Sequence, residues 1–306
     1  MRDYRAAIAL NNAGVNLLEK RAYKQAMETL QDGIHVMKEA FRRPQGASPQ
    51  DMLQTSLRPV SSAEIDFKLR RASHHIAHPQ PMHIPMPFHA VVDGQGKQDG
   101  VDLKALSFDV TGISSSAHRV LDFLGESPST TCFLPIRIDL PSDSYFSQDS
   151  FDRMVGCLRD ADAESAVMLY NFGVANLLLS KAVAAACESS VPGRINREAM
   201  GTALTGDNVA EKLRANAISI LNLASGVLSK KSAGGCEDTV EETVLLQLGL
   251  LVFHTIIQVL VEGGNDMEAQ IVYDRYVLLR QAVAAIQESE WFYNSEGLTK
   301  ISAPAA

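Results

Sequence analysis

The sequence predicts a mainly α protein, an antiparallel helix-hairpin stack that carries a small β or irregular insert. Three observations support this fold class. Apolar residues recur at helical spacing through residues 6–41, with a single interruption of three residues. Proline, serine and glutamine then break the pattern, which returns across residues 151–292. Pieces of the first pattern recur in that later region, as is typical of a protein built from repeated helical units.

Residues 1–42 are expected to form the first hairpin. Only residues 20–22 separate its two amphipathic segments, and a connection this short makes the two helices antiparallel neighbours. Gly14 and Ala26 are small residues on the inward faces, so we expect them to oppose each other where the helix axes approach closely. The inward-facing residues are Ala6, Leu10, Ala13, Gly14, Leu17 and Leu18 in the first helix, and Tyr23, Ala26, Leu30, Gly33, Ile34 and Met37 in the second.

This hairpin resembles a tetratricopeptide repeat (TPR), a helical unit of about 34 residues. That family places a small residue in the first helix, an aromatic residue at the turn, and a small, a large and a small residue along the second helix. Gly14, Tyr23, Ala26, Leu30 and Gly33 occupy those places here. The family's tryptophan and terminal proline are missing, so the chain is similar to a divergent TPR-like helical repeat protein. An ordinary helical hairpin is the alternative.

A second, degenerate copy of the unit follows in the helical repeat region 151–292. An Asn-x-Gly-Val series that begins at Asn12 begins again at Asn171. A loop over residues 188–206 is expected to precede the partner helix of this copy. In that helix the spacing of the first hairpin's small-large-small series recurs at Ala217, Leu221 and Ala224.

The third copy starts at Gly249, inside a long helix, and its second helix repeats the same spacing at Ala269, Tyr273 and Tyr276. Because one hairpin cannot bury both of its faces alone, we expect the first hairpin to pack against the helix around Gly173. The intervening region 44–150 would then be looped out to one side.

Residues 43–150 are expected to form a linker and a small β or irregular insert. The stretch 43–62 is rich in proline, serine and glutamine, so it should be the most protease-sensitive internal site. A β-hairpin and a third short strand are expected beyond residue 88, with Pro135 placing the third strand at a sheet edge. The expected elements are a short helix at 63–73, strands at 88–92, 103–110 and 132–140, and a flexible tail at 293–306.

Composition excludes several classes of protein. The net charge of −8 argues against a broad nucleic-acid-binding surface, which needs clustered lysine and arginine. The four cysteines lie far apart and indicate free thiols in a reducing compartment, so we expect a cytoplasmic or nuclear location with no signal peptide. Polar residues interrupt the apolar run 244–261, and we expect it to be a central helix of the stack and not a membrane span.

The search for catalytic chemistry is negative. The chain has no phosphate-binding loop, nucleophile elbow, zinc-binding helix pair or dinucleotide fingerprint. Five histidines lie between His74 and His89, but prolines break this segment and no cysteine accompanies it, so we expect solvated histidines and no metal site. We assign no catalytic residue, cofactor or metal. The alternative is an enzyme with an unrecognised site between the helical stack and the insert at 88–140.

The favoured function is a protein-protein interaction module, or scaffold. The TPR resemblance implies a surface lined by first-helix residues that binds a peptide or a partner helix. It also implies that side-chain amides there hydrogen-bond the backbone of a bound peptide; the candidates are Asn12, Asn16, Asn171 and Asn176. Independently, the series Leu-Arg-Arg-Ala-Ser ending at Ser73 resembles the substrate pattern of basophilic protein kinases, which makes Ser73 a possible phosphosite.

Overall fold

The structure is a computed structural model of the whole chain. It describes the backbone of residues 2–42, 61–82, 106–109, 112–113, 133–139, 158–189, 197–232 and 239–299. Side chains are described for residues 3–40, 61–82, 133–139, 162–187, 208–229 and 245–285. Residues 43–60 of the linker predicted at 43–62, and the strand predicted at 88–92, lie outside the described residues.

The predicted mainly α class is confirmed, because helices account for most of the described residues. Three short strands accompany them. The helices are α1 (Arg2–Glu19), α2 (Tyr23–Arg42), α3 (Ser62–Ala77), α6 (Leu158–Ser189), α7 (Arg197–Ser232), α8 (Thr239–Glu262) and α9 (Asp266–Thr299), and the strands are β1 (Leu106–Asp109), β2 (Gly112–Ile113) and β3 (Ile136–Ile138).

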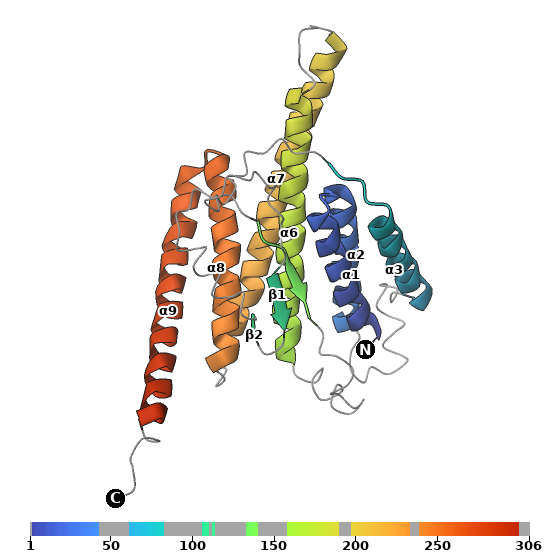
Figure 1. Ribbon diagram of the computed structural model, residues 1–306. Helices are drawn as coiled ribbons and strands as arrows, with labels where there is room; N and C mark the ends of the chain where they lie inside the picture. The colour runs from blue at the N-terminus through green and yellow to red at the C-terminus, as the bar shows by residue number, and fades with distance from the viewer. Residues whose placement is uncertain are drawn as a thin grey trace, which may run out of the picture.

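The helices lie side by side in a row, with α3 at one end and α9 at the other (Figure 1). Helices that follow each other in sequence pack as pairs: α1 with α2, α6 with α7, and α8 with α9. The pairs are joined by contacts of α2 with α6 and of α7 with α8. A Cβ atom added at Gly33 of α2 would lie 3.0 Å from Cε of Met168 in α6, so the first hairpin does pack on this helix, as predicted.

The described parts of the intervening region do not loop out to one side, however. Helix α3 packs on α1 and α2, and strand β3 packs on α1 and α6. Both elements bring apolar side chains back to the first hairpin: Ile65 of α3 and Ile136 of β3 are each 1% exposed. The expectation that this region loops out was wrong, because these segments carry apolar side chains that are buried against the first hairpin.

Glycines mark where helices of a pair come closest. A Cβ atom at Gly14 of α1 would lie 2.5 Å from Cγ of Leu30 in α2, and one at Gly173 of α6 would lie 2.8 Å from Cγ of Leu221 in α7. These are the two pairs that the internal repeat aligned. The prediction that Gly14 opposes Ala26 was wrong by one helical turn, since the three nearest atoms all belong to Leu30.

In the third pair the glycine contacts a residue outside the predicted series Ala269, Tyr273 and Tyr276. A Cβ atom at Gly249 of α8 would meet Leu279 of α9 at 3.0 Å. Tyr273 is 45% exposed and stacks on Tyr276, with ring centroids 6.2 Å apart. The buried residues of α9 recur every seven positions instead, at Ala269, Tyr276 and Val283, which is the spacing of two helices packed along a narrow seam.

The turn between α1 and α2 is closed by a backbone hydrogen-bond pair. Ala22 donates its N–H to the Leu17 carbonyl and Arg21 donates to the Leu18 carbonyl, both at 2.9 Å. This is the Schellman arrangement, and it places Arg21 at φ 60°, in the left-handed region that glycine adopts at lower cost. The connection is thus as short as predicted, and the side chain of Arg21 makes its left-handed backbone conformation unfavourable.

Several predicted boundaries need correction. Helix α3 is longer than the predicted 63–73, and its first turn is capped by Ser61, whose Oγ accepts the Glu64 N–H at 3.1 Å. Helix α7 begins at Arg197, so the loop predicted at 188–206 is too long. Helix α9 continues to Thr299, beyond the predicted end of the helical region.

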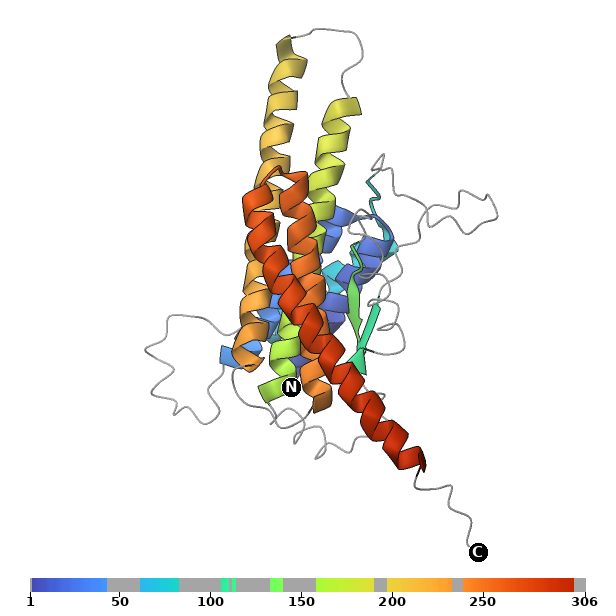
Figure 2. The same ribbon diagram turned by 90° about the vertical axis from the view of Figure 1, so that its left-hand side faces the viewer.

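The three strands form a sheet in the order β2-β1-β3, with β1 antiparallel to β2 and parallel to β3. The edge position predicted from Pro135 is confirmed, since β3 is an outer strand. Strands β1 and β2 form an antiparallel hairpin, and β1 falls within the strand predicted at 103–110. The sheet covers the face formed by the first helix of each pair, because β3 contacts α1 and α6 and β2 contacts α8 (Figure 2).

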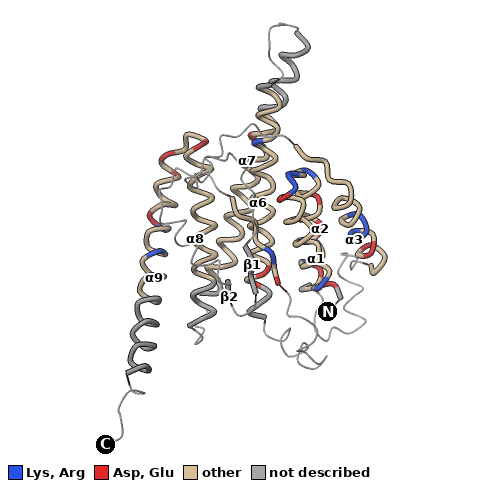
Figure 3. The backbone as a smooth tube through the Cα atoms, viewed as in Figure 1, with Lys and Arg blue, Asp and Glu red and all other residues tan. Residues whose placement is uncertain are grey.

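Charged residues are sparse on the described parts of α6 and α8. Figure 3 shows charged residues on α3, around the α1–α2 turn and at the α8–α9 turn. Two helical segments, Asp162–Cys187 and Leu245–Glu262, are apolar and long enough to cross a membrane, but 78% and 72% of their apolar windows are buried inside the molecule. Burial of that extent fits central helices of the row and makes them weak candidates for membrane spans.

Candidate functional site

Two asparagines of the predicted set bind the backbone of β3. Asn171 of α6 accepts the Ile136 N–H through Oδ1 at 2.8 Å and donates from Nδ2 to the Ile136 carbonyl at 2.7 Å. Asn12 of α1 does the same for Ile138: Oδ1 accepts its N–H at 2.9 Å and Nδ2 donates to its carbonyl at 2.7 Å. Each side-chain amide therefore brackets one residue of an extended segment.

The spacing of the two brackets follows from strand geometry. Successive residues of a β-strand direct their N–H and C=O groups to opposite edges, so Ile136 and Ile138 present theirs to the same edge. The opposite edge pairs with β1 in parallel register, with Ser107 opposite Arg137. Asn12 and Asn171 thus take the place of a neighbouring strand, and they do so from the two positions that the Asn-x-Gly-Val series aligned.

A third asparagine, Asn11, completes the network. Asn171 donates to Asn11 Oδ1 at 2.9 Å, while Asn11 Nδ2 contacts Asn12 Oδ1 at 3.2 Å and the Ile136 carbonyl at 3.4 Å. Asn11 and Asn171 are both fully buried. A buried amide left without partners costs about 1–3 kcal/mol, so the two helices and the strand depend on one another for hydrogen bonding.

The side chains of the segment 133–139 are also recognised individually. Phe133 is fully buried with Lys181 Nζ 4.9 Å from its ring centroid, a cation–π geometry. Ile136 and Ile138 are each 1% exposed, whereas Arg137 between them forms an ion pair with Glu19 of α1. The helical face therefore offers an aromatic site, two aliphatic sites and an acidic group.

The attachment of this segment is energetically balanced. Full burial of three side chains such as Phe133, Ile136 and Ile138 stabilises by about 5–9 kcal/mol. The amide hydrogen bonds add about 0.5–1.5 kcal/mol each. Ordering a backbone of this length costs about 7–14 kcal/mol. The stabilising terms and the ordering cost are therefore of the same size, so the segment depends on the helical face for its attachment.

The other two predicted asparagines do not reach β3. Asn176 is fully buried, donates to the Phe172 carbonyl one turn earlier at 2.8 Å, and accepts from Asn216 of α7 at 3.0 Å. It therefore joins α6 to α7. Asn16 lies half-buried on α1, and within the described part of the chain its side chain makes no hydrogen bond to β3.

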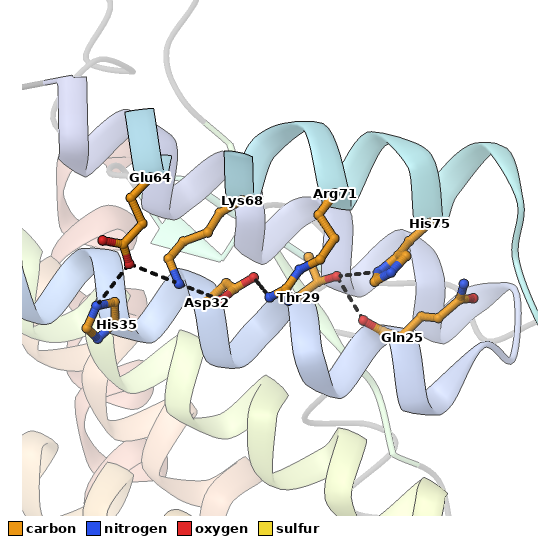
Figure 4. Close-up of polar contacts among 8 residues, drawn as sticks. All are labelled: Gln25, Thr29, Asp32, His35, Glu64, Lys68, Arg71 and His75. Atoms are coloured by element: carbon orange, nitrogen blue, oxygen red, sulfur yellow. Dashed lines mark hydrogen bonds and ion pairs between the residues drawn. The ribbon is translucent and has the colours of Figure 1, made fainter. Parts of the chain in front are cut away.

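Ser73 lies in the fourth turn of α3, exposed, with its hydroxyl donating to the Leu69 carbonyl at 3.0 Å. The basic residue two positions before it, Arg71, is bound to the buried carboxylate of Asp32, and Lys68 reaches the same carboxylate at 2.7 Å (Figure 4). The kinase-like series is therefore helical, and one of its arginines is engaged by α2. Phosphorylation of Ser73 stays a prediction.

The rest of this α2–α3 seam is polar as well. His35 lies 3.7 Å from Glu64, and Thr29 donates to the Gln25 carbonyl at 2.8 Å with His75 Nδ1 3.5 Å away (Figure 4). Burial lowers the pKa of His75, and the charge of Glu28 opposes that shift. Burial, the larger of the two effects, favours the neutral ring, and the seam as a whole attaches α3 to the first hairpin.

Sequence reasoning missed Asn11, Phe133, Arg137 and Glu19. Asn11 adjoins Asn12, so a scan for polar residues beside the repeated series could have found it; nothing local marks the other three. Among the described residues no group of three or more His, Cys, Asp or Glu side chains could hold a metal ion. His83 and His89 lie outside those residues. What the site can do chemically is hydrogen-bond and bury an extended peptide.

No family model, curated protein or solved structure matches the chain. The TPR resemblance therefore rests on the residues of this chain alone. One observation departs from it: α6 has 32 residues by itself, nearly the length of a whole TPR unit of about 34 residues.

Proposed function

We propose that the protein is a TPR-like interaction module that binds an extended peptide on the face formed by α1 and α6. The observation that carries this proposal is the pair of brackets, in which Asn12 and Asn171 each hold the N–H and C=O of one residue. The chain's own residues 133–139 occupy this site in the structure, and they report what the site accepts.

Backbone hydrogen bonds and side-chain contacts contribute differently to such binding. Backbone hydrogen bonds provide affinity for any extended segment, because every non-proline residue carries the same donor and acceptor. Side-chain sites then select the sequence. Here those sites are the buried surroundings of Phe133, Ile136 and Ile138, and the carboxylate of Glu19 that pairs with Arg137.

The proposal is tested with the full-length chain in which Ile136→Ser and Ile138→Ser weaken the resident strand. The probe is a fluorescently labelled synthetic peptide with the sequence of residues 133–139, and the readout is fluorescence polarisation. We expect saturable binding. Adding Asn12→Ala and Asn171→Ala should lower the affinity at least tenfold, since each removes two hydrogen bonds and 1.4 kcal/mol is tenfold.

The matched control is Asn176→Ala in the same background. It also removes a buried amide from α6, but one that is bonded within the helices. Its affinity for the peptide should equal that of the background. No binding by the weakened chain, or equal loss of affinity in the control, would contradict the proposal.

A further inference from the structure

We propose that residues 133–139 are an internal ligand that occludes the binding face, so that a partner peptide must displace β3 to bind. This inference rests on the proposed function, and it adds the regulation of that site and the chemistry of the partner. The resident strand uses the brackets completely. Both polar groups of Asn12 and of Asn171 are committed to β3, so an incoming peptide finds no free amide at either position.

Strand β3 is attached as a bound peptide would be. It is an outer strand, bonded to another strand on one edge only, and its sheet has three strands of two to four residues. Sheets this small have little stability apart from what they pack on. The energetic balance given above means that attachment depends on the helical face.

The sequence of the resident strand indicates the sequence of a competing peptide. Ile136 and Ile138 lie two positions apart and are both buried against the helices, while Arg137 alternates to pair with Glu19. Phe133 is held under Lys181 three positions before the first isoleucine. The partner is thus an extended protein segment with an aromatic residue, then an aliphatic-basic-aliphatic triplet starting three positions later.

The helices stay in place when β3 leaves. The contacts of α2 with α6 include the approach of Gly33 to Met168, and neither residue belongs to the site. Tyr4 of α1 donates a hydrogen bond to Glu164 of α6, also away from the strand. Departure of β3 therefore exposes the face without separating the two helices that build it.

The first test is hydrogen–deuterium exchange of the wild-type full-length chain, read by mass spectrometry. If β3 detaches locally, peptides covering residues 133–139 should exchange at least about tenfold faster than peptides covering the buried part of α6. Excess synthetic peptide with the sequence of residues 133–139, built with heavy isotopes to separate its mass, should accelerate exchange of the resident strand further. Exchange of the strand at the rate of α6, unchanged by the peptide, would overturn the inference.

The second test compares peptide affinity for the wild-type chain and for the Ile136→Ser, Ile138→Ser chain. Occlusion lowers the apparent affinity by the fraction of molecules in which the face is open, so the weakened chain should bind at least about tenfold more tightly. Equal affinity for both chains would overturn the occlusion and leave the proposed function standing. Absence of binding to either chain would overturn the proposed function itself. A peptide in which the arginine is replaced by glutamate should bind more weakly to the weakened chain, and equal binding would overturn the partner chemistry.

Discussion

Gly14→Ala is the sharpest test of how the first pair of helices is packed. The added Cβ would lie 2.5 Å from Cγ and 2.7 Å from Cδ2 of Leu30, where ordinary carbon contacts need about 3.5–4.0 Å. Leu30 is 1% exposed, so other residues enclose its side chain. Overpacking of this kind costs about 1–3 kcal/mol, which cancels or exceeds the gain of about 1 kcal/mol from replacing glycine by alanine in a helix.

The matched control is Gly226→Ala in α7, where a Cβ would meet nothing within 4 Å. That variant should gain up to about 1 kcal/mol of unfolding free energy, so the two alanine variants should differ by about 1–3 kcal/mol. Urea unfolding followed by circular dichroism measures both. Gly173→Ala, which would place Cβ 2.8 Å from Leu221 Cγ, should behave like Gly14→Ala.

A double variant then separates the clash from any other effect of the alanine. Gly14→Ala combined with Leu30→Ala should cost less than the two single changes added together, because the second removes the atoms that the first would strike. If Gly14→Ala is instead as stabilising as Gly226→Ala, α1 and α2 do not approach at this point and the pairing described here is incorrect.

Three further predictions each concern one residue. Arg21→Gly should raise the unfolding free energy by about 1 kcal/mol, because glycine adopts φ 60° without the Cβ strain of arginine; a lower melting temperature would show that the turn is not left-handed. Asp32→Asn should destabilise by about 1–3 kcal/mol, since it leaves Lys68 and Arg71 of α3 without their carboxylate, and protease cleavage within α3 should speed up; cleavage at the wild-type rate would contradict the seam. Burial lowers the pKa of His254 in the folded chain, so as the pH falls below the ordinary value of 6.5 this side chain is protonated in the unfolded chain first. The unfolding free energy should therefore fall as the pH drops below 6.5, and His254→Gln should make that fall less steep in urea titrations. The same pH dependence in the variant would mean that His254 lies in solvent.

Local patterns predicted the parts of this fold that depend on neighbours in sequence. The short connection at residues 20–22 determined the first hairpin, and the repeated Asn-x-Gly-Val series identified Asn12 and Asn171 as equivalent positions. Those two asparagines turned out to bracket the same strand. Spacing alone could place a small residue at the helix contact, but it could not say which side chain one turn along would meet it, so Gly14 was assigned to Ala26 and not to Leu30.

The remainder depends on contacts between distant residues. The bonds from Asn12 to Ile138 join positions 126 residues apart, and no local signal in the strand specifies that register. Asn16 and Asn176 are asparagines like those of the site, but they do not reach β3. Residues of one type at different positions along a helix face different neighbours. In α9 two patterns are compatible with the sequence: the series Ala269, Tyr273, Tyr276 and the seven-residue repeat Ala269, Tyr276, Val283. Only packing on α8 selects the second pattern, which leaves Tyr273 exposed.

The most direct measurement is amide exchange at Ile136 and Ile138, resolved by NMR in the full-length chain. The central claim is that Asn171 and Asn12 hold these two N–H groups. Asn12→Ala combined with Asn171→Ala should therefore accelerate exchange at both amides at least tenfold, the equivalent of about 1.4 kcal/mol, while Asn176→Ala leaves both rates unchanged. Unaltered exchange at Ile136 and Ile138 in the double variant would mean that the two asparagines do not hold the strand.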